Sequence, residues 1–159
     1  MSSRLGSLTN HHLYLAKLLR QELELKLAAS TMSESLLLDA WGQAVLWHLH
    51  ATYRALVAEL AEKAKRDLAD VEHVLAIGDA AVVDCLPAEL REIADLQRTG
   101  WLHAMLHASR DARAPVATSV DPLALKEVPT QYFGVDELMH WYASMDRLID
   151  RFRETTIEC

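Results

Sequence analysis

The stretch Glu34–Arg66 reads ESLLLDAWGQAVLWHLHATYRALVAELAEKAKR and carries two adjacent apolar stripes at helical spacing. Side chains that recur every three or four residues lie on one face of a helix, so the pattern predicts a helix with neighbours on two sides. At the standard rise per residue this helix is about 50 Å long. One stripe comprises Leu38, Trp41, Val45, His48 and Thr52, and the other comprises Leu46, Leu49, Tyr53, Leu56 and Leu60.

The segments on both sides of this stretch repeat the helical rhythm and are separated by capping and turn residues. Ser33 is the predicted N-cap of the long helix, and Gly78 is the predicted stop of a short one. Gly100 either separates two helices or kinks a continuous one. The predicted helices cover residues 9–29 with Thr9 or Asn10 as N-cap, then 34–66, 71–77, 87–98, 101 to about 112, and 135 or 136 to 152.

Length and composition favour one all-α domain over residues 1–159. The chain has 159 residues, 51% of them hydrophobic, and only 5 Gly and 4 Pro. A chain of this size organises a single core, and few turn formers favour long helices. We expect a single-domain helical bundle of the four-helix type with one or two additional short helices. Pro115, Pro122 and Pro129 predict a long loop at about 114–133.

Charge and cysteine content restrict the partners and the compartment. The net charge of -7 opposes binding to nucleic acid, and the longest uncharged stretch, 40–53, is too short and too polar to span a membrane. The polar residues 1–10 lack the features of a secretory signal. The 2 cysteines, Cys85 and Cys159, do not form the framework of a small secreted fold, so we expect a cytoplasmic protein.

Several segments resemble an uncharacterised family of small helical proteins from pseudomonads and related bacteria. The resemblance covers nearly the whole chain and implies a bacterial, helical protein with no established activity. The matching segments are Thr9-Asn10 with Leu13-Tyr14, the run HLHATYRALVAELA at 48–61, Leu86–Leu90 leading to Trp101-Leu102, and the ending 152–159.

The 8 histidines are numerous for this length and raise the possibility of a divalent metal. His103 and His107 are four residues apart, so their rings share one face of a helix, and His48 could supply a third ligand. This set resembles the DinB/YfiT-like metal-binding bundles, which implies a metal-activated water as the reagent. The alternative is that His48 is a hydrogen-bonded histidine at the edge of the core and that the other two are exposed or line a groove.

Two further pairs match only part of a known site. Glu137 and His140 have the Glu-x-x-His spacing of di-iron bundles, but the second pair and the additional glutamates are missing, so Glu137 fits better as an acid at a helix start. Arg98 and His103 have the Arg-x4-His spacing of HEPN-type ribonucleases, although Gly100 and the acidic charge oppose that reading.

Trp47, His50 and Arg54 form a candidate protein interface. They lie apart from the first apolar stripe of the long helix, and aromatic residues are enriched at interfaces. Packing of Trp47 against the first or last helix is the alternative. Because no catalytic set is complete, we expect a non-enzymatic interaction or accessory protein, with a protein partner or self-association and no cofactor; the alternatives are the metal-dependent enzyme and the ribonuclease.

Overall fold

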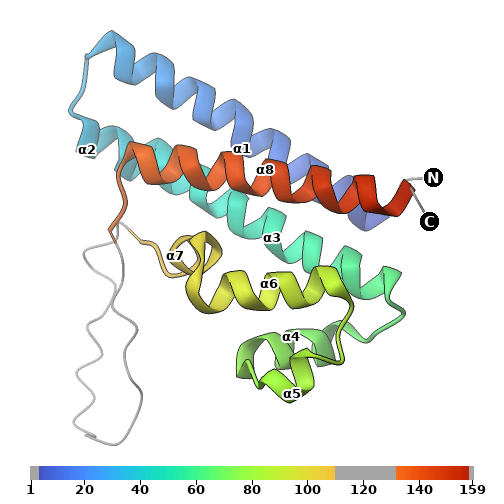
Figure 1. Cartoon of the computed structure of the whole chain (residues 1–159). Helices are drawn as coiled ribbons and strands as arrows, with labels where there is room; N and C mark the ends of the chain where they lie inside the picture. The colour runs from blue at the N-terminus through green and yellow to red at the C-terminus, as the bar shows by residue number, and fades with distance from the viewer. Residues whose placement is uncertain (1–3, 110–131, 158–159) are drawn as a thin grey trace, which may run out of the picture.

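The computed structural model describes residues 4–109 and 132–157, and every regular element in those ranges is a helix (Figure 1). The all-α prediction is confirmed. No helix in the described ranges is long and apolar enough to cross a membrane. Of the predicted loop at 114–133, residues 114–131 lie outside the described ranges. The elements are α1 (Arg4–Ala29), α2 (Glu34–Leu37), η1 (Leu38–Gly42), α3 (Gln43–Lys63), α4 (Leu68–Ile77), α5 (Ala80–Val83), α6 (Ala88–Thr99), α7 (Trp101–Leu106) and α8 (Val135–Ile157).

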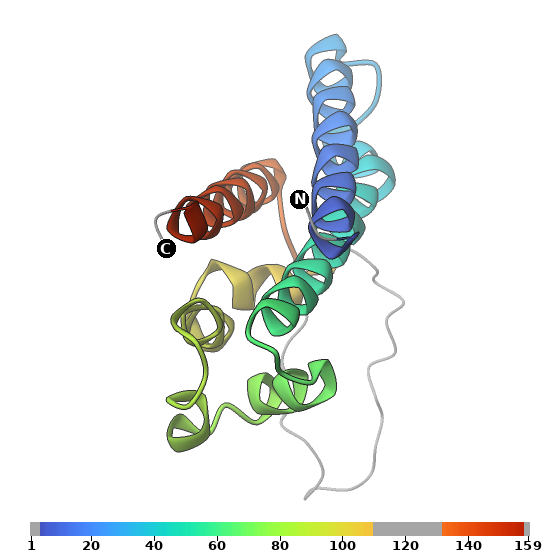
Figure 2. The same ribbon diagram turned by 90° about the vertical axis from the view of Figure 1, so that its right-hand side faces the viewer.

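The core lies between α3, α8 and the pair α6 and α7. Helix α1 runs antiparallel to α3, and α8 passes beside both (Figure 1). Figure 2 shows α1 at one edge of the described part and α4 and α5 at the opposite edge. The four-helix arrangement and the single domain stay predictions. The largest fully buried side chains are Leu23, Leu37, Leu38, Val45, Leu49, Leu90, Ile93, Leu102, Met105, Leu138, Met145 and Ile149.

The predicted long helix is present from Glu34, but it ends at Lys63 and not at Arg66. Lys65 adopts a left-handed backbone conformation with φ of 53°, which no α-helix accommodates. The amide of Arg66 then donates to the carbonyl of Ala61 at 2.9 Å, which closes the last turn. The charged residues at 62–66 are therefore a helix end followed by a turn.

One wide turn interrupts this helix at Leu38–Gly42, where the backbone follows a π-helix. A π-turn is a local bulge that the apolar spacing alone does not predict. Gly42 is buried in this turn, and a Cβ atom there would lie 3.1 Å from Cδ2 of Leu38 and 3.5 Å from Cε2 of Phe133. The missing side chain lets Phe133, just before α8, approach the long helix closely.

The predicted caps of the long helix and of α4 are confirmed. The hydroxyl of Ser33 accepts a hydrogen bond from the amide of Leu36 at 3.3 Å. Helix α4 starts at Leu68, earlier than the predicted residue 71, because the carboxylate of Asp67 caps its first amides. It ends at Gly78, whose φ of 67° places it in the left-handed region that favours glycine.

The predicted N-cap at Thr9 or Asn10 is wrong, because α1 already begins at Arg4. Thr9 lies inside the helix and is fully buried. Its hydroxyl lies 3.1 Å from the carbonyl oxygen of Leu5 and 3.2 Å from Oε2 of Glu59. A residue type that suits a cap is used here to connect α1 to α3.

Gly100 separates α6 and α7 into two helices and does not form a kink in one helix. Its backbone is extended, with φ of -97° and ψ of -171°. Helix α7 ends at Leu106, earlier than the predicted Ala112. The backbone leaves the helical conformation at His107, where φ is -100° and ψ is 3°, and the ring of this residue folds back so that Nδ1 donates to the carbonyl of His103 at 2.8 Å.

The last predicted helix is confirmed as α8, which continues beyond the predicted residue 152 to Ile157. Trp141 is only 2% exposed, and its ring lies 5.5 Å from that of Phe133. Trp41, which belongs to the first predicted apolar stripe of the long helix, is half-buried, and the ammonium of Lys26 lies 4.7 Å from the centre of its ring. Both tryptophans thus hold helices together.

Candidate functional site

The first histidine cluster lies where α1 meets α3. Nδ1 of His12 lies 3.2 Å from Nδ1 of His48, so one imidazole donates and the other accepts. The ring of His11 lies edge-on to that of His12 at 5.6 Å. Trp47 lies edge-on to both members of the pair, 5.9 Å from His12 and 4.8 Å from His48 between ring centres.

Both imidazoles of this pair favour the neutral form. Partial burial lowers the pKa of His12, and the nearby charges of His11 and Arg54 lower it further. Partial burial also lowers the pKa of His48, with additional contributions from His12 and His11. Near neutral pH each ring therefore has one nitrogen without a hydrogen, which can accept a hydrogen bond or bind a metal.

The second histidine cluster lies at the C-terminal end of α7, with His103 in the helix and His107 directly after it. Nδ1 of His103 bonds to the carbonyl of Gln97 at 2.8 Å, and Nδ1 of His107 bonds to the carbonyl of His103 at the same distance. Since a carbonyl only accepts, each Nδ1 has the hydrogen. The two rings lie 4.3 Å apart. His50 approaches from α3, with Nε2 at 2.9 Å from the carbonyl of Met105, and burial lowers its pKa.

The structure does not bring His48 to His103 and His107. His48 and His50 are two positions apart on α3, so they point to opposite sides of that helix, and the one that reaches α7 is His50. Within residues 4–109 and 132–157, no group of three or more His, Cys, Asp or Glu side chains could hold a metal ion. The metal-enzyme hypothesis therefore lacks the geometry on which it depended.

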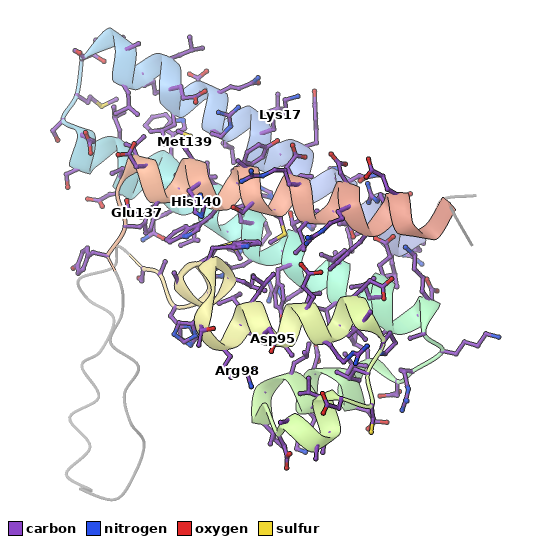
Figure 3. The ribbon with its side chains drawn as sticks, in the orientation of Figure 1. Lys17, Asp95, Arg98, Glu137, Met139 and His140 are labelled. Carbon is purple, nitrogen blue, oxygen red and sulfur yellow. The ribbon has the colours of Figure 1, made fainter. Side chains whose placement is uncertain are left out.

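Arg98 and His103 line one surface hollow between the end of α4 and α6. The hollow has a volume of about 260 Å³, and Ile77, Gly78 and Val83 complete much of its wall. Nη2 of Arg98 is bonded to Oδ1 of Asp95 at 2.6 Å, and Figure 3 shows both side chains on the same side of α6. This ion pair is exposed, so it contributes little to stability, and the ribonuclease hypothesis stays a prediction.

Glu137 is an acid at a helix start. Its Oε2 accepts a hydrogen bond from the amide of Gly134 at 2.9 Å, at the beginning of α8. His140 lies one turn further along the same helix and is exposed (Figure 3). The capping role of Glu137 thus explains this glutamate without a metal.

The predicted interface of Trp47, His50 and Arg54 is only partly open. Trp47 is 56% exposed and Arg54 is exposed, but His50 is half-buried and turned to the carbonyl of Met105. A buried imidazole needs a hydrogen-bond partner, and α7 supplies it. His50 therefore belongs to the contact between α3 and α7, and the role of the other two in an interface stays a prediction.

Sequence reasoning missed an exposed stripe on α1. Two leucines of this helix, Leu8 and Leu18, are each 43% exposed. The sequence feature that could have indicated this stripe is a spacing of alternately three and four residues, which places one set of side chains on a single helix face. Residues 11, 14, 18, 21, 25 and 28 follow this spacing, and all six are exposed. We name these six residues the α1 outer face: His11, Tyr14, Leu18, Gln21, Leu25 and Ala28.

The fold and these clusters define an all-helical protein built on the long antiparallel pair of α1 and α3. The chain belongs to a family of unknown function, DUF6586, whose family model matches residues 1–159. This confirms the resemblance to an uncharacterised family; the pseudomonad origin stays a prediction. No curated protein and no solved structure is detectably similar to the chain.

Proposed function

We propose that this is a non-enzymatic, cytoplasmic interaction protein that pairs with a second copy of itself through the α1 outer face. The observation that carries the proposal is the exposure of large apolar side chains along that face. Tyr14 is 58% exposed, Leu18 is 43% exposed and Leu25 is 67% exposed. Contiguous exposed apolar residues at one helix face are typical of protein contacts.

The opposite side of the same helix is already occupied. Ala16 and Leu23 are fully buried in the core, on the side of α1 that packs against α3. Arg20 lies over the ring of Tyr142 on α8 at 4.9 Å, which covers a flank. A helix with apolar residues on two opposite sides needs a packing partner on each side. In the described structure α3 is the partner on the inner side of α1.

The spacing of the α1 outer face suits a helix pair. Alternate steps of three and four residues form the seam of a coiled coil. In an antiparallel pair centred between Leu18 and Gln21, Leu18 meets Gln21 of the second copy and Tyr14 meets Leu25. The same two-fold operation produces each contact twice, so one helix face is complementary to itself.

Charge complementarity favours a second copy over an unrelated partner. Lys17 and Glu24 flank the seam on the same edge, and the antiparallel register places Lys17 opposite Glu24 of the second copy. Figure 3 shows Lys17 on the side of α1 turned away from α8. Glu24 also pairs with Arg20 within its own helix at 2.6 Å, which leaves a second carboxylate oxygen for the contact.

Trp47 lies on α3 beside the start of α1. Its ring lies edge-on to that of His12 at 5.9 Å, and the ring of His11, the first residue of the α1 outer face, lies edge-on to that of His12 at 5.6 Å. Trp47 therefore lies near one end of the α1 outer face, on the side where α3 packs, and its role in an interface stays a prediction. The cytoplasmic assignment is supported by Cys85, which is an exposed free thiol. The absence of enzymatic activity is supported by Glu137, whose carboxylate already caps α8.

Sedimentation over a range of protein concentrations tests the proposal. The native chain should form a dimer, and Leu18→Glu/Leu25→Glu should remain monomeric at concentrations where the native chain pairs. The matched control is Ile77→Glu, because Ile77 is 61% exposed on α4 and lies away from α1. A native chain that stays monomeric, or a dimer that Leu18→Glu/Leu25→Glu leaves intact, would refute the proposal.

A further inference from the structure

We infer that His12 of α1 and His48 of α3 form a binding site for one divalent transition-metal ion of the zinc or copper class. The site differs from the predicted set of His48, His103 and His107, since it uses a partner on α1. It is independent of self-association, because both ligands come from one chain.

The separation of the two nitrogens supports the site. Nδ1 of His12 and Nδ1 of His48 lie 3.2 Å apart. Imidazole nitrogens bind zinc at about 2.0–2.1 Å, which places two ligands of a tetrahedral ion about 3.3 Å from each other. The two atoms therefore already have the spacing of neighbouring ligands, although the helices that hold them are far apart in sequence.

The hydrogen bond between the two rings can be exchanged for two bonds to a metal ion. In the metal-free pair one Nδ1 has a hydrogen that the other accepts. When an ion binds, that hydrogen moves to Nε2 of the same ring, and both Nδ1 lone pairs point to the ion. Imidazole ligands select zinc, copper or nickel over magnesium or calcium.

Two protein ligands leave further positions for water, so the site is weaker than a three-histidine centre. The ion would nevertheless join α1 to α3, and it would stabilise the folded chain by mass action. Trp47 provides a reporter, because its ring lies 4.8 Å from that of His48 and 5.9 Å from that of His12.

Titration with Cu²⁺ while tryptophan fluorescence is recorded tests the site. The reference chain for this titration has two double substitutions. His103→Ala/His107→Ala removes the second pair of neighbouring histidines, and Leu18→Glu/Leu25→Glu keeps the chain monomeric. We expect quenching that saturates at one ion per chain, displacement by excess Zn²⁺, and a higher melting temperature with either ion. Trp47→Phe should remove most of the quenching and keep the shift in melting temperature.

In this reference chain, His12→Gln and His48→Gln should each weaken Cu²⁺ binding at least about tenfold. His11→Gln is the matched control, because it removes a neighbouring imidazole and keeps the pair. Circular dichroism checks that each variant is folded, and Gln preserves side-chain length where Ala could loosen the contact. Equal Cu²⁺ affinity in all three variants, or no saturable binding by the reference chain, would overturn the inference.

Discussion

The hydroxyl of Thr9 on α1 lies 3.2 Å from Oε2 of Glu59 on α3, and both residues are buried. The same carboxylate lies 3.2 Å from Nζ of Lys63 and 3.9 Å from Nη2 of Arg153 on α8. One side chain thus joins three helices. Because buried charges are costly without partners, this group of contacts explains how the bundle accommodates an inward-facing glutamate.

Glu59→Gln should lower the free energy of unfolding by about 1–3 kcal/mol, because it removes the charge that Lys63 and Arg153 neutralise. Urea unfolding followed by circular dichroism measures the change. Glu62→Gln is the control, since Glu62 is exposed on the same helix and should change stability by less than about 0.5 kcal/mol. Equal stability of the two variants would contradict a structural role for the Glu59 contacts.

Gly78→Ala should destabilise the chain by about 1 kcal/mol, because φ at this position is 67° and an L-residue is strained there. A Cβ atom at Gly78 would meet no other atom within 4 Å, so the cost comes from the backbone alone. Gly78→Asn should cost less, since asparagine tolerates the left-handed conformation. Urea midpoints of the two variants give the comparison, and the reverse order would show that another effect dominates.

The helices were largely predictable from sequence because their signals are local. Ser33 and Gly78 act through backbone groups a few residues away, and the apolar periodicity of α3 needs no knowledge of the fold. Contacts between distant segments were not predictable in this way. The spacing of His48 permits several partners, and only the packing of α1 on α3 selects His12.

Helix α1 shows a second limit of sequence reasoning. Its apolar residues occur on both sides, so periodicity alone could not indicate that Leu23 is buried whereas Leu25 is exposed. Thr9 was misread for a similar reason, since threonine suits both a cap and a buried contact with a carboxylate. The long-range partner, Glu59, decides between these roles.

Stability should fall at alkaline pH through Tyr53. Burial raises the pKa of its hydroxyl from 10.0 to about 12, and the charge of Glu72 adds to the shift. The folded chain thus retains this proton where the unfolded chain releases it, so the contribution is complete below pH 10 and is lost as pH rises towards 12. Tyr53→Phe should flatten the fall in urea midpoint across this window; Tyr142→Phe, whose side chain is nearer the surface, should flatten it less.

Lys17→Glu should weaken the proposed dimer about fivefold to tenfold, because it places two carboxylates opposite each other at both ends of the antiparallel seam. Lys17→Glu/Glu24→Lys should recover most of the affinity, since the second change restores opposite charges. Sedimentation at low salt measures the dimer affinity of the single and the double variant. The difference between the two affinities should shrink at high salt, where surface charges are screened.

If Lys17→Glu/Glu22→Lys recovers affinity and Lys17→Glu/Glu24→Lys does not, the two copies pair in parallel, because Lys17 then lies opposite Glu22 of the second copy. Recovery by neither double variant would show that this edge of α1 takes no part in the contact.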